Sequence, residues 1–158
     1  MIDFMILGLP RSGTAWVANL LTTDHSICVH ESFIHHTLEE LDKQFLGLRF
    51  GISETSAIYQ IEAINAHLAP KLIIERSLTD INDSLKKMSF PLMPDDSIDM
   101  LNQIEGYRIQ FKDLFDPIVM SKVCRTVFGL PFNIHRFNLL CDMNVQNHTA
   151  IELVREMV

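Results

Sequence analysis

The sequence predicts an α/β protein, with a three-layer α/β/α arrangement around a central, mostly parallel sheet of about five strands. Short apolar runs alternate with helix-like segments about five times along the 158 residues, which is typical of a parallel sheet covered by helices on both faces. The first apolar run ends in a glycine and leads directly into a helical pattern. The length suits one domain with its own core, so we expect residues 1–158 to form a single domain.

Five apolar runs are the predicted strands. The first ends at Gly8, and the fourth carries Ile73 and Ile74 at its centre, as a strand buried on both faces would. The predicted strands cover residues 3–7, 26–30, 46–52, 71–76 and 107–111.

The segments between these runs have helical spacing of their apolar residues. One segment has Asp80 near its start and Lys87 near its end, as the helix dipole favours. Another begins with Pro117 and stops at Gly129. The predicted helices cover residues 14–22, 34–45, 55–68, 78–88, 97–104 and 116–132, and two shorter helices close the chain.

The composition narrows the class of protein. Hydrophobic residues make up 47% and the formal net charge is −7, which argues against a general nucleic-acid binder. The apolar runs are too short to span a bilayer, which needs ~20 residues, so no membrane association is expected. The three cysteines, Cys28, Cys124 and Cys141, form no C-x-x-C pair. We therefore expect a cytoplasmic protein with reduced, buried thiols.

Residues 8–16, "GLPRSGTAW", have the glycine spacing of a phosphate-binding P-loop, G-x-x-x-x-G-K-[ST]. Thr14 stands where that motif has lysine, and Ala15 where it has the magnesium-binding hydroxyl. A loop between a strand and a helix presents unpaired backbone N–H groups to an anion, and Arg11 adds a fixed charge. The sequence therefore predicts a phosphate or sulfate ligand handled without a metal, the alternative being an ordinary strand–helix turn.

The same stretch resembles the 5′-phosphosulfate loop of sulfotransferases, P-[KR]-S-G-T-T-W, which binds 3′-phosphoadenosine 5′-phosphosulfate (PAPS). The resemblance implies the sulfotransferase type of the P-loop nucleoside triphosphate hydrolase-like fold. Ala15 departs from the family pattern and removes one hydroxyl contact. Trp16 would stack near adenine, or it is a core residue of the helix. The implied cofactor-binding residues here are Pro10, Arg11, Ser12, Gly13, Thr14, Ala15 and Trp16.

A second family signature is an arginine at the end of a strand and a serine eight residues later, which together hold the 3′-phosphate. Arg76 and Ser84 match it, and Asp80 is kept between them. Considered without the first loop, Arg76 would be interpreted as a residue of a surface salt bridge and Ser84 as an ordinary helix serine. A third similarity to the family is "YRIQFKDLFDP" followed by "VFGLPF". It implies a structural role for this segment and not a catalytic one. The later R-K-G segment of many cytosolic members is absent from the sequence.

The stretch "CVHESFIHH" contains the predicted general base. Glu31 lies 20 residues after Arg11, which is about the spacing in the tyrosylprotein type of sulfotransferase. His30 is the second choice, and a carboxylate at a helix N-terminus is the structural alternative for Glu31. "HESFIH" is one residue too long for the zinc motif H-E-x-x-H, so no metal is expected.

The sequence and the resemblance together predict a sulfotransferase. It would move a sulfuryl group from PAPS to a hydroxyl or amine of a small molecule, sugar or peptide, releasing 3′,5′-bisphosphoadenosine (PAP). Glu31 would be the base, and Arg11 would neutralise charge at the reacting group. Residues 53–55 could line the pocket, and the loop at 89–96 is a lid or a plain connection. The alternatives are a non-catalytic nucleotide-binding protein of the same fold and a P-loop small-molecule kinase.

Overall fold

A five-stranded sheet forms the centre of the computed structural model, which describes residues 1–44 and 47–143. All strand pairs are parallel, in the order β2-β3-β1-β4-β5. This confirms the predicted α/β class with its parallel sheet. The strands are β1 (Phe4–Gly8), β2 (Ser26–His30), β3 (Arg49–Glu54), β4 (Lys71–Glu75) and β5 (Tyr107–Gln110).

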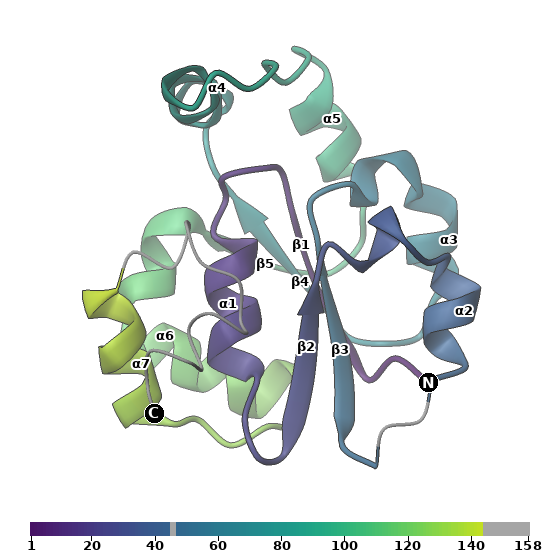
Figure 1. Ribbon diagram of the computed structural model, residues 1–158, viewed down its shortest axis with the longest axis vertical. Coiled ribbons are helices and arrows are strands. Elements are labelled where there is room, and N and C mark those ends of the chain that lie inside the picture. The colour runs from purple at the N-terminus through teal and green to yellow at the C-terminus, as the bar shows by residue number, and fades with distance from the viewer. Residues whose placement is uncertain (45–46, 144–158) are drawn as a thin grey trace.

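Helices cover both faces of this sheet. Figure 1 shows α1, α6 and α7 on one side, α2 and α3 on the other, and α4 and α5 toward the carboxyl ends of the strands. The seven α-helices of the described residues are α1 (Thr14–Leu21), α2 (Leu38–Asp42), α3 (Ile61–Ala66), α4 (Leu78–Lys87), α5 (Ser97–Asn102), α6 (Pro117–Lys122) and α7 (Ile134–Asp142). None of them is long and apolar enough to cross a bilayer.

The core has two halves, one on each face of the sheet, because successive strand side chains point to opposite faces. Phe4 and Ile6 of β1 pack into the half formed with α1, α6 and α7. Met5 and Leu7 pack into the half that includes side chains of α2 to α5. Strand β1 is therefore buried on both faces and holds the loop that follows it in a fixed position.

The predicted helices over 34–45 and 55–68 were too long. A 3₁₀ turn at Ser32–Ile34 comes first, and Thr37 then begins α2 with a capping box in which its hydroxyl accepts from the Glu40 N–H. The second region consists of a 3₁₀ turn, Ala57–Tyr59, and the short α3. Strand β3 runs to Glu54, two residues further than predicted.

The region predicted as one helix over 116–132 is α6 followed by the π-helical segment Val123–Val127. The predicted start is confirmed, because Pro117 is its first residue and Asp116 accepts hydrogen bonds from the Ile118 and Val119 N–H groups. Gly129 follows with φ 63°. Helix α7 is one of the two predicted closing helices; residues 144–158 lie outside the described part of the chain.

Two of the three cysteines are placed as expected. Cys28 and Cys124 are buried, but Cys141 is exposed on α7, so the expectation of a buried thiol was wrong there. Burial raises the pKa of the Cys124 thiol to about 12, which keeps it protonated and unreactive.

Candidate functional site

The loop between β1 and α1 lies where the strand order changes direction. From β1 the chain moves to one side of the sheet for β2 and β3, and to the other side for β4 and β5. The carboxyl end of β1 is therefore the switch point at which open α/β sheets bind ligands. The Ser12 hydroxyl closes the loop by donating a 2.5 Å hydrogen bond to the Leu9 carbonyl.

Two glycines make this loop possible. A Cβ on Gly8 would lie 2.3 Å from Ser12 Oγ, so a larger residue would displace the hydroxyl that closes the loop. Gly13 has φ 90°, a conformation that favours glycine, and a Cβ there would lie 2.4 Å from Leu114 Cδ1. Gly13 is also the N-cap of α1 and, having no side chain, makes no side-chain cap hydrogen bond to the first turn. The N–H groups of the first turn therefore remain able to bind an anion.

The structure brings Arg76 and Ser84 directly to this loop. Arg11 Nε donates a 2.9 Å hydrogen bond to Ser84 Oγ, and Arg76 donates from a terminal nitrogen to the Arg11 carbonyl. The guanidinium of Arg76 also lies 4.2 Å from the centre of the Phe111 ring, within cation–π distance. The two sequence motifs thus form one cluster at the ends of β1 and β4.

This cluster is electropositive. The pKa of Arg11 is lowered from its ordinary value, first because burial disfavours the charged form and second because the charge of Arg76 repels it. An arginine remains protonated at neutral pH despite such a shift. An anion bound between the two guanidinium groups would relieve their repulsion.

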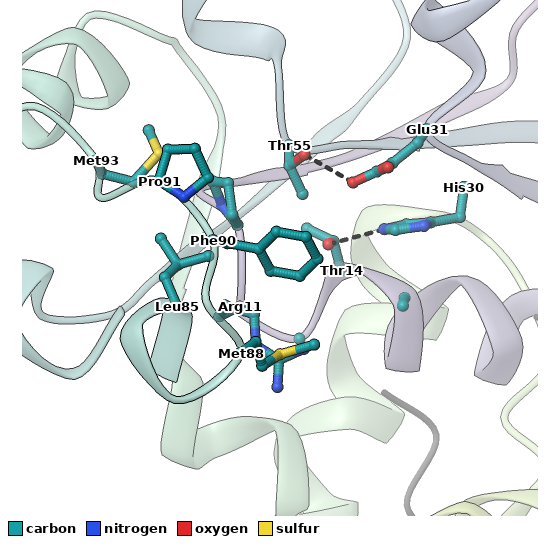
Figure 2. A pocket seen from close by; sticks show the side chains of 13 residues that line it. Arg11, Thr14, His30, Glu31, Thr55, Leu85, Met88, Phe90, Pro91 and Met93 are labelled. Carbon is teal, nitrogen blue, oxygen red and sulfur yellow. Dashed lines mark hydrogen bonds between the residues drawn. The ribbon is translucent and has the colours of Figure 1, made fainter. Parts of the chain in front are cut away.

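Glu31 lies at the end of β2, where the chain turns sharply. Its backbone has φ 55°, and its N–H continues the sheet by donating to the Ser53 carbonyl at 2.8 Å. Its carboxylate accepts a 2.9 Å hydrogen bond from Thr55 Oγ1, a residue that directly follows β3. This turn starts the 3₁₀ segment and aims the carboxylate toward the loop side of the sheet (Figure 2).

A buried carboxylate holds the residues after Glu31. Glu54 Oε1 accepts hydrogen bonds from the Ser32 hydroxyl at 2.5 Å and from the Phe33 N–H at 3.1 Å. The side chain is almost fully buried, and its Oε2 has no hydrogen-bond partner among the described residues. Burial is the main reason why the pKa of Glu54 is raised. Glu54 therefore fixes the turn that positions Glu31.

His30 lies beside Glu31 and contacts the loop. Its Nε2 is 3.2 Å from Thr14 Oγ1, in a hydrogen bond in which either group can be the donor (Figure 2). The surrounding protein lowers the pKa of His30 by desolvating it, although the charge of Glu31 acts in the opposite direction. The imidazole is thus neutral at pH 7 and able to accept a proton.

A cavity of about 520 Å³ opens between these groups (Figure 2). One side of it is polar and consists of loop and strand-end residues, and the other is apolar and comes from α4 and the segment after it. The lining residues are Pro10, Arg11, Gly13, Thr14, Ala15, His30, Glu31, Thr55, Leu85, Met88, Phe90, Pro91 and Met93. Six of the predicted site residues therefore share one cavity: Pro10, Arg11, Gly13, Thr14, Ala15 and Glu31.

Backbone strain concentrates around this cavity. Within residues 1–44 and 47–143, the residues other than glycine with positive φ are Arg11 (66°), Glu31 (55°) and Ser89 (59°). Arg11 and Glu31 line the cavity, and Ser89 lies between the lining residues Met88 and Phe90. Each such residue costs on the order of 1 kcal/mol, and strain of this kind clusters at functional sites.

Four predicted site residues lie outside that cavity. Ser12 is buried beneath the loop, and Ser84 reaches the site through Arg11. Arg76 lines a second cavity of about 450 Å³ next to the ends of β4 and β5. Trp16 is buried against Phe137, so the structure places it where the core alternative predicted.

The sequence did not define the apolar wall or the bond between Thr14 and His30. A signal for the wall was present in "LKKMSFPLM", where large apolar residues follow the polar end of a helix. In the described part of the chain, no group of three or more His, Cys, Asp and Glu side chains is arranged to hold a metal ion.

Comparison with protein-family models, with curated proteins and with solved structures finds no match to this chain.

Proposed function

We propose that this chain is a PAPS-dependent sulfotransferase with the sulfotransferase type of P-loop fold. The observation that carries the proposal is the joining of two separate motifs: Arg11 of the first loop is hydrogen-bonded to Ser84, and Arg76 is hydrogen-bonded to the Arg11 carbonyl. Each motif was identified from the sequence as a candidate for phosphate binding. The spacing of the residues within one motif does not predict contact with the other motif.

The residues present suit a ligand with two anionic groups. The glycine loop, the uncapped start of α1 and Arg11 would hold the 5′ side. Arg76 and Ser84 would hold the 3′-phosphate, with hydroxyl and guanidinium donors suited to its oxygens. When bound, PAPS would supply the sulfuryl group that is transferred to the acceptor.

The chain's own residues would manage charge and protons. Arg11 lines the cavity and neutralises negative charge that develops there. Glu31 is the proposed base, held in place by Thr55 and ready to take the proton of an acceptor hydroxyl or amine. His30, kept neutral by its lowered pKa, is the second candidate for this role.

Calorimetric titration with PAP, with ATP–magnesium and with AMP tests the proposal. We expect PAP to bind the wild type more tightly than the other two ligands, and Arg76→Ala to lose most of that affinity. Arg125→Ala is the matched control, because it removes the same charge from a residue that lines neither cavity. Preference for ATP–magnesium would instead support the kinase alternative, and PAP binding without sulfuryl transfer to any acceptor would support the non-catalytic one.

A further inference from the structure

The wall of the cavity opposite Glu31 has apolar side chains, and several of its backbone N–H groups are already hydrogen-bonded. Leu85, Met88, Phe90, Pro91 and Met93 carry no side-chain N–H or O–H. Figure 2 shows Met93, Pro91 and Leu85 on one side of the cavity, and Glu31 and His30 on the other.

The end of α4 uses the backbone N–H groups of this wall. Phe90 donates to the Leu85 carbonyl at 3.0 Å and Ser89 donates to the Lys86 carbonyl at 3.1 Å, which is the Schellman pattern of a helix C-terminus. Met88 N–H donates to the Leu85 carbonyl as well. The left-handed residue in this pattern, normally a glycine, is Ser89, and Phe90 follows it directly into the cavity wall.

Asn82 fixes the far end of the wall. Its Oδ1 accepts from the Met93 N–H at 2.8 Å, and its Nδ2 donates to the Met93 carbonyl at 3.3 Å. The wall is therefore tied to α4 at both ends. A ligand that contacts these side chains meets apolar surface and no side-chain hydrogen-bonding group.

This apolar surface is partly open to solvent. Phe90 is 54% exposed and Met88 39% exposed, although both line the cavity. A ligand that covers them gains about 25 cal/mol per Å² of apolar area removed from water. The ring of Phe90 can stack on an aromatic ligand, and the thioethers of Met88 and Met93 adapt to its edge.

We propose that the acceptor is a small molecule with an apolar, ring-shaped body and one hydroxyl or amine group, and not a sugar or a peptide. The body lies on Phe90, Met88 and Met93, and the polar group points to Glu31 and His30. The volume of about 520 Å³ is in the range of small-molecule sites. A sugar needs hydrogen-bond partners along its whole edge, which the side chains of this wall do not provide. That this molecule is an acceptor depends on the proposed function, whereas its chemical class is inferred from the apolar wall of the cavity.

The test is fluorescence titration with 2-naphthol, beside calorimetry with methyl glucoside and a tri-alanine peptide, each with and without saturating PAP. Phe90→Ala should weaken 2-naphthol binding about tenfold, since much of the ring's covered area is lost. Phe90→Leu, which keeps an apolar side chain and guards against a folding defect, should retain most of the affinity. Leu92→Ala is the matched control, because Leu92 is 57% exposed in the same segment but does not line the cavity.

Equal 2-naphthol affinity in wild type and Phe90→Ala, or tighter binding of the glucoside or the peptide, would overturn the inference. If PAP binds and 2-naphthol does not, the acceptor class is wrong and the proposed function stands. If 2-naphthol binds through Phe90 and PAP does not bind, the proposed function is wrong and the ligand class of the cavity stands.

Discussion

Arg11 Nε donates a 2.9 Å hydrogen bond to Ser84 Oγ, joining two residues that lie 73 positions apart in the chain. The bond links the loop after β1 to the middle of α4 and sets the direction of the Arg11 side chain. Because both residues are proposed to bind one nucleotide, their contributions to its affinity should depend on each other.

A double-mutant cycle on PAP affinity measures this dependence. We expect Ser84→Ala to weaken PAP binding about tenfold, as the loss of a hydrogen bond to a charged group does. The losses in Arg11→Ala and Ser84→Ala should fail to add, with a coupling of about 0.5–3 kcal/mol. Ser84→Ala combined with Arg125→Ala provides the reference, where simple addition is expected.

Glu31→Gln should separate catalysis from nucleotide binding. The amide keeps the shape of the side chain but cannot take a proton, so kcat should fall about 10²- to 10⁴-fold. PAP affinity should stay unchanged, because Glu31 is assigned no nucleotide contact. Glu62→Gln on the exposed face of α3 is the control for the change in charge. Undiminished turnover in Glu31→Gln would transfer the role of base to His30.

The buried Glu54 should make stability depend on pH. Its pKa is raised above 4.5, chiefly by burial, so the folded state holds this proton more tightly than the unfolded state does. The stabilising contribution is fully present below about pH 4.5 and is lost as the pH rises through the raised value. Glu54→Gln removes this effect, so the stability of the variant relative to wild type should increase as the pH rises above about 4.5.

Urea denaturation across that pH range provides the measurement for Glu54. The Glu62→Gln variant, which changes an exposed carboxylate, should show no such trend against wild type. A stability difference between Glu54→Gln and wild type that stays constant with pH would contradict the prediction.

Ser89→Gly should stabilise the protein. Ser89 has φ 59° in the position of a helix end that favours glycine, so the substitution removes strain and should raise the free energy of unfolding by about 1 kcal/mol. The same change at Ser121, inside α6, should lower it by about 0.5 kcal/mol, because glycine is a poorer helix former than serine. Denaturant titration of both variants measures the two changes in the free energy of unfolding, which should have opposite signs. A loss of stability in Ser89→Gly would refute the strain at this position.

The strands and the glycine-containing turn between β1 and α1 could be predicted from the sequence because their signals are local. The strand at 26–30 was predicted with its observed bounds, and a glycine ends β1 as the pattern indicated. Helix lengths were harder to predict. Thr37 starts a new helix by capping it, and this local hydrogen bond competes with the longer helical pattern around it.

Candidate site residues could be selected one by one from the sequence, but the contacts between them could not. Arg11 and Ser84 belong to motifs assigned to different phosphate groups and lie 73 positions apart, so their hydrogen bond could not be predicted from the sequence. Whether Trp16 lies in the core or beside adenine depends on its contact with Phe137, which is distant in the sequence. A local sequence pattern cannot predict such a contact. The apolar wall was missed for a similar reason, since the apolar residues of "LKKMSFPLM" do not report that the turn at Ser89 brings them to the cavity.

Trp16 is the single tryptophan of the chain, and its indole N–H donates a 3.1 Å hydrogen bond to the Leu140 carbonyl of α7. The protein therefore carries one built-in optical reporter at the contact between α1 and α7. If α7 separates from α1, water reaches the indole and its emission moves to longer wavelength. Because α1 starts at the loop that lines the candidate site, one unlabelled spectrum can follow both ligand binding at one end of this helix and loosening of the packing along it.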